Sequence, residues 1–189
     1  MKHIMVDLET LGTAHDCVVL SLGAVKFDLL GNDDAKSIEL NDIEEGMDDR
    51  SLYFILPPQP KRSVDQSTIN WWKKQSPEAR VVLDGNPTVE TIAEVQHNFF
   101  KFCEETEFLW GNGNMFDNAI LRNLFAPNFP YRYYQDMDYR TLKTLYMELG
   151  FTTFPSYGSI PHHALCDAKM QVLTAQFMTR MIKNGGMED

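Results

Sequence analysis

The sequence has little of what marks disulfide-rich or membrane proteins. Its 189 residues include three cysteines, Cys17, Cys103 and Cys166, and no two of them form a CxxC pair. Neither a disulfide framework nor a thiolate zinc site is therefore expected. No apolar run approaches the roughly 20 residues that cross a bilayer, and the acid at Asp7 comes too early for a secretory signal peptide. These absences favour a cytoplasmic protein in a reducing compartment, with no membrane as a partner.

Basic residues are also scarce. The chain has 17 Lys and Arg against 27 Asp and Glu, a net charge of -10. Proteins that bind nucleic acid usually present a basic face to the phosphates, so the composition does not point to such a partner. The acidity has two explanations: carboxylates that hold cations in an active site, or charge that keeps the protein soluble. Composition alone leaves both open.

The pattern of apolar residues predicts one α/β domain over residues 1–189. β-Rich runs come first, at residues 2–9, 17–27 and 52–56, and a short buried strand follows at 108–110. Helical patterns cover 67–75, a segment from Ser76, a long amphipathic segment opened by Thr88, and residues 116–125, 138–149 and 163–183. No repeat or linker divides the chain. The order predicts a mixed β-sheet flanked by α-helices.

An acidic segment, residues 32–50, interrupts the early strands with eight acids and two bases. We expect a solvated insertion, although its acids are also candidates for binding cations. The segment contains a D-x-E pair, Asp42 and Glu44, that lies on no apolar strand. Such a pair recurs easily by chance in an acidic chain, and we interpret this copy as a decoy.

A second D-x-E pair, Asp7 and Glu9, lies on the first predicted strand. Residues i and i+2 of a strand point to the same face, so the two carboxylates are presented together. Two adjacent carboxylates on a mostly apolar strand repel each other unless a cation lies between them. Oxygen ligands of this kind suit Mg²⁺ or Mn²⁺.

A third acid, Asp117, follows the strand at 108–110 and a turn that contains Gly111 and Gly113. It begins the next predicted helix, where it is either a helix cap or a metal ligand beyond a strand end. These two alternatives stay open on the sequence alone. The glycines lack the spacing of a dinucleotide-binding fingerprint.

A histidine and an acid, His162 and Asp167, lie at the start of the last predicted helix. Five residues on a helix correspond to a rotation of about 140°, so the two could not share one helical face. They converge only if His162 precedes the helix and Asp167 lies on its first turn, a boundary that Pro161 favours. His163 would then be an ordinary residue at the start of the helix. A plain surface pair or a helix cap is the alternative.

Taken together, the three motifs resemble those of the DEDDh 3′–5′ exonucleases, the DnaQ-like branch of the ribonuclease H-like superfold. That family carries an acidic strand motif, an Asn–aromatic–Asp motif and a His–Asp motif. The matching residues are, in chain order, Asp7, Glu9 and Thr10; Asn112, Phe116 and Asp117; His162 and Asp167. Stretches 69–75, 110–113 and 139–142 narrow the resemblance to bacteriophage DexA-type exonucleases and RNase AS-type exoribonucleases. Residues 136–140 match that group's D-x-R-T stretch only loosely, and we assign no catalytic role there.

The resemblance implies a ribonuclease H-like sheet and a two-metal active site. Two Mg²⁺ or Mn²⁺ ions would be held by the four acids Asp7, Glu9, Asp117 and Asp167, with Asp7 shared between them. His162 would take a proton from the attacking water, because an imidazole titrates near neutral pH. Bound cations would also account for the acidic composition, since a loaded site becomes locally electropositive.

Substrate contacts are expected beside these motifs. The candidates are Thr10, Leu11, Asn112, Phe116 and Trp72. Trp71 and Trp72 lie about 100° apart on a helix, so at most one is fully in the core and the other is a candidate to stack on a base. Packing of both is the plainer alternative. The basic cluster nearest to a substrate path is Lys61, Arg62, Lys73 and Lys74, unless these are solubilising charges.

The sequence thus predicts a 3′–5′ exonuclease that releases nucleoside 5′-monophosphates from single-stranded 3′ ends. DNA is the preferred substrate because the DexA-type resemblance is closest, and an exoribonuclease is the runner-up. A rival of another class is a non-catalytic acidic protein that mimics DNA. Acids on a strand, beside a histidine, argue against such a mimic, which needs acids that are exposed and spread out.

Overall fold

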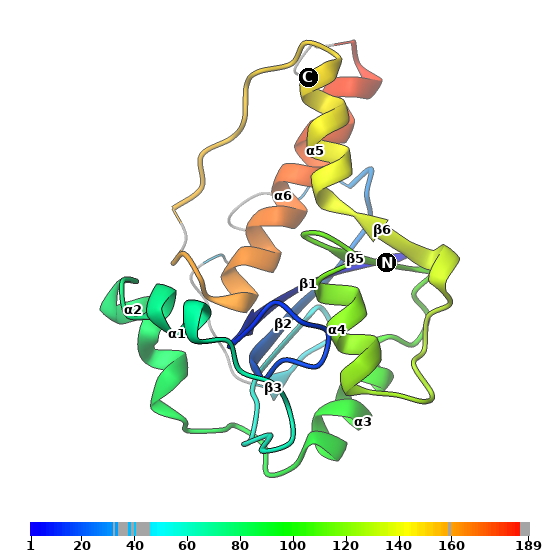
Figure 1. Cartoon of the computed structure of the whole chain (residues 1–189). Helices are drawn as coiled ribbons and strands as arrows, with labels where there is room; N and C mark the ends of the chain where they lie inside the picture. The colour runs from blue at the N-terminus through cyan, green and yellow to red at the C-terminus, as the bar shows by residue number, and fades with distance from the viewer. Residues whose placement is uncertain (32, 34–37, 39, 41–45, 159, 186–189) are drawn as a thin grey trace.

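A six-stranded mixed sheet forms the centre of the computed structural model, which describes residues 1–31, 33, 38, 40, 46–158 and 160–185 (Figure 1). The strands are β1 (His3–Thr10), β2 (Val19–Phe27), β3 (Gly46–Met47), β4 (Ser51–Ile55), β5 (Phe108–Gly111) and β6 (Asp136–Asp138). Their order in the sheet is β3-β4-β2-β1-β5-β6. The pairs on the β3 side of β1 are antiparallel, whereas β5 and β6 run parallel to β1. The predicted mixed sheet is confirmed.

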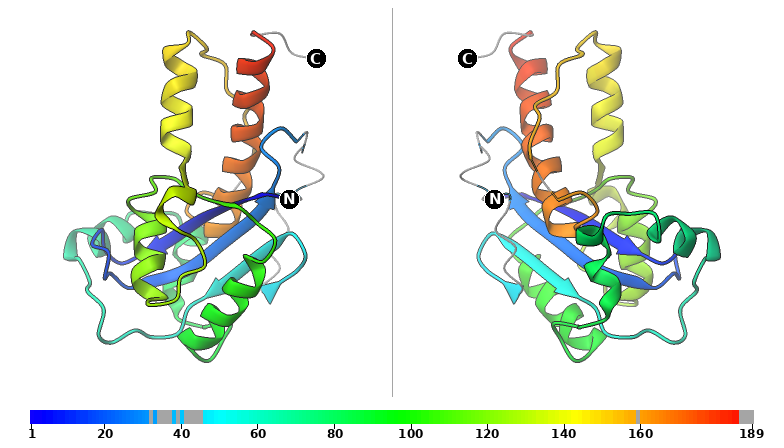
Figure 2. Two further views of the ribbon diagram at one scale, coloured as in Figure 1. Left: turned by 90° about the vertical axis from the view of Figure 1, so that its right-hand side faces the viewer. Right: turned by 90° about the vertical axis from the view of Figure 1, so that its left-hand side faces the viewer.

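Helices cover both faces of the sheet. They are α1 (Gln66–Trp72), α2 (Pro77–Arg80), α3 (Ile92–Phe102), α4 (Asp117–Leu124), α5 (Tyr139–Glu148) and α6 (Ala164–Lys183), with 3-10 turns η1 (Val81–Asp84) and η2 (Tyr133–Gln135). Helix α6 packs on β1 and β2 with α5 beside it, and α3 and α4 pack on the opposite face (Figure 2). Within the described residues, none of these helices has the length and apolar character needed to span a membrane.

The alternation along β1 divides its side chains between two hydrophobic clusters. Ile4, Val6 and Leu8 pack with residues of α3 and α4, whereas Met5 packs with residues of α6. Asp7 and Glu9 continue the Met5 series, so the same alternation turns both carboxylates toward the α6 face. The period of the strand therefore positions the D-x-E pair.

Helix caps mostly follow the sequence, with one correction. Ser76, where the sequence predicts a helix to begin, accepts a hydrogen bond from the Ala79 N–H and caps α2. The long helix does not begin at Thr88, because Thr91 caps α3 and the Thr88 hydroxyl accepts a hydrogen bond from the Ile55 N–H instead. Thr88 and Thr91 are equally suited to cap a helix by side-chain chemistry. Thr88 bonds instead to Ile55 at the end of β4, and Thr91 is the cap.

The acidic segment is only partly the loop that we expected. Gly46 and Met47 form β3 and pair with β4, so this end of the segment belongs to the sheet. Asp42 and Glu44, the decoy pair, lie outside the described residues. That residues 1–189 make a single domain stays a prediction.

Candidate active site

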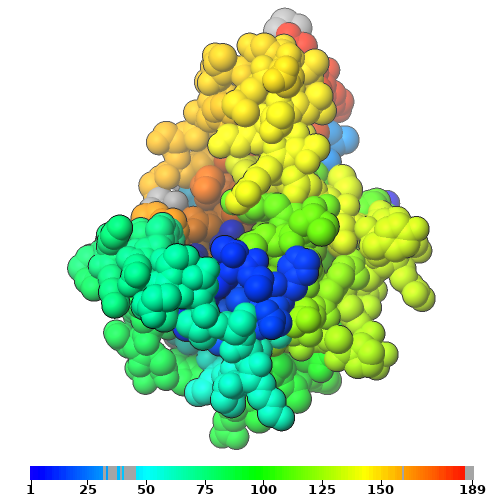
Figure 3. All heavy atoms as spheres, in the orientation of Figure 1, coloured from blue at the N-terminus to red at the C-terminus, as the bar shows by residue number. Residues whose placement is uncertain are grey.

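Carboxylates from three elements meet in one cleft of about 680 Å³. Asp7 and Glu9 come from β1, Asp117 is the first residue of α4, and Asp167 lies on the first turn of α6. The cleft opens on the face seen in Figure 3, between α1, β1 and α6. Asp7, Glu9 and Asp167 line it, and Asp117 is close enough to raise the pKa of Asp7. The structure brings together the four acids that the sequence nominated.

Two glycines permit this convergence. Gly23 pairs with Asp7 across β1 and β2, and a Cβ at Gly23 would lie 2.3 Å from backbone atoms of Ala164 and Leu165. The absent side chain lets the first turn of α6 rest on the sheet. Gly111 does the same for α4, because its Cβ would lie 3.1 Å from Asp117 Oδ2. Both helices therefore begin in close contact with the strands that carry or flank the acids.

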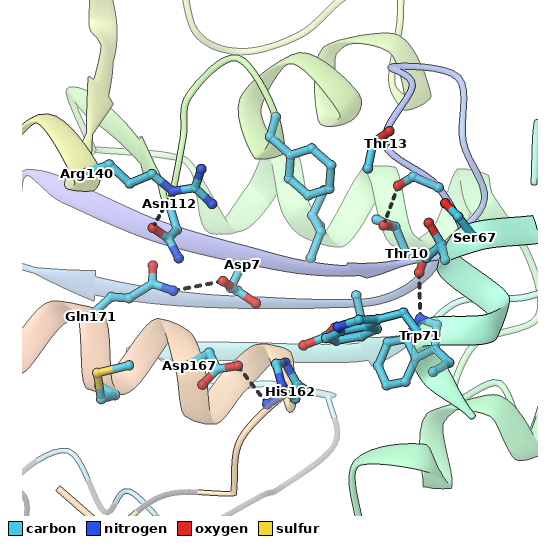
Figure 4. A pocket seen from close by; sticks show the side chains of 17 residues that line it. Asp7, Thr10, Thr13, Ser67, Trp71, Asn112, Arg140, His162, Asp167 and Gln171 are labelled. Carbon is cyan, nitrogen blue, oxygen red and sulfur yellow. Dashed lines mark hydrogen bonds between the residues drawn. The ribbon is translucent and has the colours of Figure 1, made fainter. Parts of the chain in front are cut away.

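His162 precedes α6 and faces Asp167, as the sequence analysis expected. Its φ of 59° is in the left-handed region, and its backbone N–H donates to Asp167 Oδ2 at 3.0 Å. One ligand atom each from His162, Glu9 and Asp167 lie within 4.8 Å of one another. The Trp71 ring meets the imidazole nearly perpendicularly, with the centroids 4.7 Å apart (Figure 4). The imidazole therefore lies among the carboxylates.

The next residue, His163, has a different role. It is the N-cap of α6, and its Nδ1 accepts a hydrogen bond from the Cys166 N–H. Its ring packs on Tyr53, and burial lowers its pKa to about 4. The capping bond matches the expectation that His163 is a helix-start residue, away from the chemistry.

The electrostatics of the four carboxylates favour a bound cation. Burial raises the pKa of Asp7 well above its ordinary value, and the charges of Asp117, Glu9 and Asp167 raise it further. Burial likewise raises the pKa of Glu9 to about 8, of Asp117 to about 7 and of Asp167 to about 6. Each shift reports a charge that is costly in the metal-free protein. A bound cation would lower that cost.

The donor set fits a divalent metal ion. It consists of carboxylate oxygens with one imidazole, the ligands that Mg²⁺, Mn²⁺ and Zn²⁺ accept in different proportions. Asp117 Oδ2 is buried and has no hydrogen-bond partner among the described residues. The N-cap of α4 is Phe116, and Asp117 is the first residue of the helix itself. The helix-cap alternative for Asp117 is therefore not supported.

The predicted substrate-contact residues divide between the cleft and its support. Thr10, Asn112, Phe116 and Trp72 line the cleft. The Thr10 hydroxyl is already engaged, because it donates to the Gly12 carbonyl at 2.8 Å. Leu11 packs against the cluster that contains Trp72 and Ala79 and does not line the cleft.

The two neighbouring tryptophans are separated as expected, but in the order opposite to the prediction. Trp72 is 1% exposed, and its indole N–H donates to the Thr10 carbonyl at 2.8 Å. Trp71 is 41% exposed and lines the cleft beside His162. Because Trp72 is held in the core, the proposal of a base-stacking residue moves to Trp71.

Sequence reasoning missed two residues of the cleft. Gln171 donates from Nε2 to Asp7 Oδ1 at 2.8 Å, and Arg140 Nε donates to Asn112 Oδ1 at 3.2 Å. The spacing could have revealed Gln171, since it lies four residues after Asp167 on the same face of α6. Arg140 lies in the 136–140 stretch to which no catalytic role was assigned.

The basic cluster proposed from the sequence does not line the cleft. Arg62 donates instead to the carbonyls of Cys17 and His15 and to Asn123 Oδ1, so its guanidinium fixes the loop after β1. Lys73 and Lys74 follow the end of α1 and are exposed.

Comparison with known proteins agrees with this geometry. Residues 2–179 match the model of the 3′–5′ exoribonuclease Rv2179c-like domain family. The chain belongs to this family of 3′–5′ exonucleases. This 3′–5′ exonuclease is also 26% identical, over 223 aligned positions, to an exodeoxyribonuclease of Enterobacteria phage T4, with 100% of this chain and 93% of the phage protein covered.

Solved structures share the fold of this exonuclease. The E. coli ExoI–ssDNA complex in its zinc-bound form superposes with a TM-score of 0.61 at 15% identity, covering 96% of this chain and 41% of ExoI. S. pombe Pop2p in its Mg²⁺- and Mn²⁺-bound form gives 0.55 at 14% identity, covering 99% and 86%. Cell-death related nuclease 4 gives 0.59 at 14% identity, covering 97% and 64%. The expected ribonuclease H-like fold is confirmed.

The rival interpretation, a DNA mimic, is not compatible with this enzyme family or with the burial of its acids. Asp7 is 9% exposed, Glu9 7% and Asp117 2%. A mimic presents its charges to a basic partner, whereas these carboxylates face one another inside a cleft.

Proposed function

We propose that this exonuclease removes nucleoside 5′-monophosphates one at a time from single-stranded DNA, using two Mg²⁺ or Mn²⁺ ions. The observation that carries the proposal is a group of four acids with raised pKa values: Asp7, Glu9 and Asp167 line a cleft with His162, and buried Asp117 lies close enough to raise the pKa of Asp7. Such a group is unfavourable without cations, and it is what a phosphodiester-hydrolysing metal centre requires.

The residues that would hold the ions are Asp7, Glu9, Asp117 and Asp167. Bound divalent ions supply electrostatic stabilisation of the phosphate oxygens and lower the pKa of a bound water. Gln171 would keep Asp7 in its orientation through the hydrogen bond from Nε2. Asp167 would hold His162 in place by accepting its backbone N–H.

His162 would act on the water. An imidazole nitrogen takes a proton from the water as its oxygen bonds to phosphorus, while the bond from phosphorus to the O3′ of the preceding nucleotide breaks. The released O3′ takes a proton from solvent, and the terminal nucleotide leaves with its phosphate on the 5′ side. The left-handed backbone at His162 supports this role, because strained backbone persists where the surrounding structure holds it.

Trp71 would stack on a base of the bound strand. Its indole is exposed at the cleft, and aromatic faces bind bases with little sequence preference. The phage relative is named for DNA, and this supports DNA as the substrate. RNA is the second candidate, and the name of the matching family supports it.

The test uses 5′-labelled oligonucleotides of one sequence, made as DNA and as RNA. With Mn²⁺ or Mg²⁺, we expect a ladder that shortens from the 3′ end, released 5′-monophosphates, and no cleavage in EDTA. A higher kcat/KM on DNA than on RNA supports the proposed substrate. A preference for RNA would establish the second candidate, and cleavage that is independent of metal would contradict the proposed mechanism.

A further inference from the structure

The cleft has two chemically different ends. Figure 4 shows Arg140 and Asn112 at one end and Trp71, Ser67 and Thr13 at the other, with Asp7 between them. Among the described residues that line the cleft, Arg140 is the only lysine or arginine. One end therefore offers a cation, and the other offers hydroxyl groups and an indole.

Arg140 has an unused hydrogen-bonding capacity. Its Nε donates to Asn112 Oδ1, but Nη1 and Nη2 make no hydrogen bond or ion pair with the described residues. Arg122, by contrast, donates to two backbone carbonyls and to Asp136 Oδ1. A guanidinium held through Nε alone keeps two paired donors for a ligand, and phosphate is a ligand that matches this fork.

The surroundings of Arg140 leave it open toward the cleft. The Arg140 charge lowers the pKa values of Asp117 and Asp138, but neither acid forms an ion pair with it among the described residues. Asp138, the N-cap of α5, already accepts from the backbone N–H groups of Asn114 and Thr141. Gly113 has a φ of 113°, and a Cβ there would lie 3.6 Å from Arg140 Cζ. A side chain at position 113 would therefore pack against the guanidinium, and the glycine avoids this contact.

We propose that Arg140 binds the backbone phosphate on the 5′ side of the scissile one, which fixes the direction of the strand in the cleft. This inference rests on the proposed function. In a strand bound by its 3′ end, no phosphate follows the scissile one on the 3′ side. The end of the cleft with Trp71, which has no lysine or arginine among the described residues, therefore suits the terminal nucleoside. On the 5′ side the strand continues with one negative charge per nucleotide. The Arg140 end of the cleft suits this part of the strand, because a cation there can bind a phosphate.

The experiment compares wild type, Arg140→Ala, Arg140→Lys and a matched control, Lys143→Ala. Lys143 is one turn further along α5 and lies over the Phe154 ring. The substrates are three: a 5′-labelled single-stranded oligomer, the same oligomer with a neutral methylphosphonate at the first linkage 5′ to the scissile bond, and a dinucleotide with only the scissile linkage. Readouts are kcat, KM and the dependence of kcat/KM on salt.

For Arg140→Ala we expect a KM about tenfold higher on the oligomer, an unchanged kcat and a salt dependence smaller by about one ion. On the dinucleotide, Arg140→Ala and wild type should be equal. The methylphosphonate should weaken wild type to the level of Arg140→Ala and should not weaken Arg140→Ala further. Arg140→Lys should be intermediate, and Lys143→Ala should behave as wild type.

Other outcomes overturn the inference. Equal losses on the oligomer and the dinucleotide would mean that Arg140 acts on the scissile phosphate. A fall in kcat with unchanged KM, or additive effects of Arg140→Ala and the methylphosphonate, would also contradict it. If Arg140→Ala does not fold, the methylphosphonate effect in Arg140→Lys relative to wild type decides the question. Failure of wild type to hydrolyse the unmodified oligomer would instead contradict the proposed function.

Discussion

Two groups of polar side chains each include residues of α4, and they differ in how their charges are paired. In one group, Asp136 accepts hydrogen bonds from Arg122 and from Asn118, so its charge is matched by a guanidinium. In the other group, the charges of Asp117, Glu9 and Asp167 raise the pKa of Asp7, and the nearby Arg140 guanidinium only partly offsets the raised pKa of Asp117. The acid of the first group forms an ion pair, whereas the acids of the second group form none among the described residues.

The difference separates a structural role from a functional one. A partly buried acid with a complete set of donors stabilises the positions of the elements that it joins. Buried acids that repel one another destabilise the metal-free fold and are retained because something else binds them. The predictions below test whether the two groups respond in these opposite ways.

The largest effect is expected when the variant Asp7→Asn is compared with the variant Asp136→Asn. Asp7→Asn should lower kcat/KM by at least about 10³-fold, because one shared metal ligand is lost. Its metal-free Tm should be unchanged or raised, because repulsion among the acids decreases, and the rise in Tm on adding Mn²⁺ should disappear.

Asp136→Asn should do the reverse. It should keep the hydrolysis rate and lower the free energy of unfolding by about 1–3 kcal/mol, because Arg122 loses its charged partner. Nuclease assays and thermal melts of both variants check the pair. An active Asp7→Asn enzyme would disprove the two-metal assignment.

The second effect separates the two neighbouring histidines. His162→Ala should slow single-turnover hydrolysis by about 10²–10⁴-fold at saturating Mn²⁺, which is the usual contribution of a general base. Its affinity for substrate should change little. His163→Ala should retain the rate and lower the free energy of unfolding by about 1 kcal/mol, because a helix cap is lost. Equal impairment of the two rates would show that the base is wrongly assigned.

A smaller effect concerns the aromatic wall of the cleft. Trp71→Ala should raise KM for an oligomer by about tenfold, because stacking on one base is lost. Trp71→Phe should restore most of the affinity, since a phenyl ring can also stack. Steady-state kinetics of the two variants check the prediction. A KM that Trp71→Ala leaves unchanged would restrict Trp71 to packing against His162.

The metal-free protein should become more stable as pH falls from 8 to about 6.5. The pKa values of Glu9, Asp117 and Asp167 are raised by burial, so the folded state binds protons there that the unfolded state does not bind. Their stabilising contribution is complete below the unfolded pKa and is lost as pH rises through the folded values.

His163 limits the window for this measurement. Its lowered pKa of about 4 means that its own contribution is present above the unfolded value and is lost as pH falls below about 6.5. Melting in EDTA between pH 8 and 6.5 isolates the carboxylates. Glu9→Gln should flatten this slope, and an unchanged slope would show that Glu9 does not titrate there.

The smallest effect is expected from the acidic pair outside both groups. Asp42→Asn together with Glu44→Gln should leave kcat/KM within a few-fold of wild type, because this D-x-E lies in a polar segment without an apolar strand to position it. Parallel assays with Asp7→Asn check the contrast. A comparable loss in the two variants would mean that the wrong carboxylate pair was chosen.

The convergence of the four acids could be predicted from the sequence because local rules place them. Strand alternation orients Asp7 and Glu9, and a proline before the last helix places His162 opposite Asp167. The resemblance to a known family then ordered these motifs into one site. None of these steps required knowledge of which distant elements touch.

The substrate side was harder because it depends on tertiary neighbours. Helix α1 is too short for its periodicity to decide which of Trp71 and Trp72 is buried. Likewise, nothing local distinguishes Arg62, which donates to loop carbonyls, from Arg140, whose terminal nitrogens make no hydrogen bond with the described part of the chain. Whether an arginine can bind a ligand depends on the tertiary neighbours of its guanidinium.

Gly23 sets the distance between two elements of the active site, β1 and α6. It touches α6 backbone to backbone, and its partner across the sheet is Asp7. The separation between the β1 acids and the α6 acid is thus set by the thickness of two main chains, which is the same whatever side chains surround them. Substitutions in the hydrophobic clusters can therefore change the stability of the enzyme without changing the distance between Asp7 on β1 and Asp167 on α6.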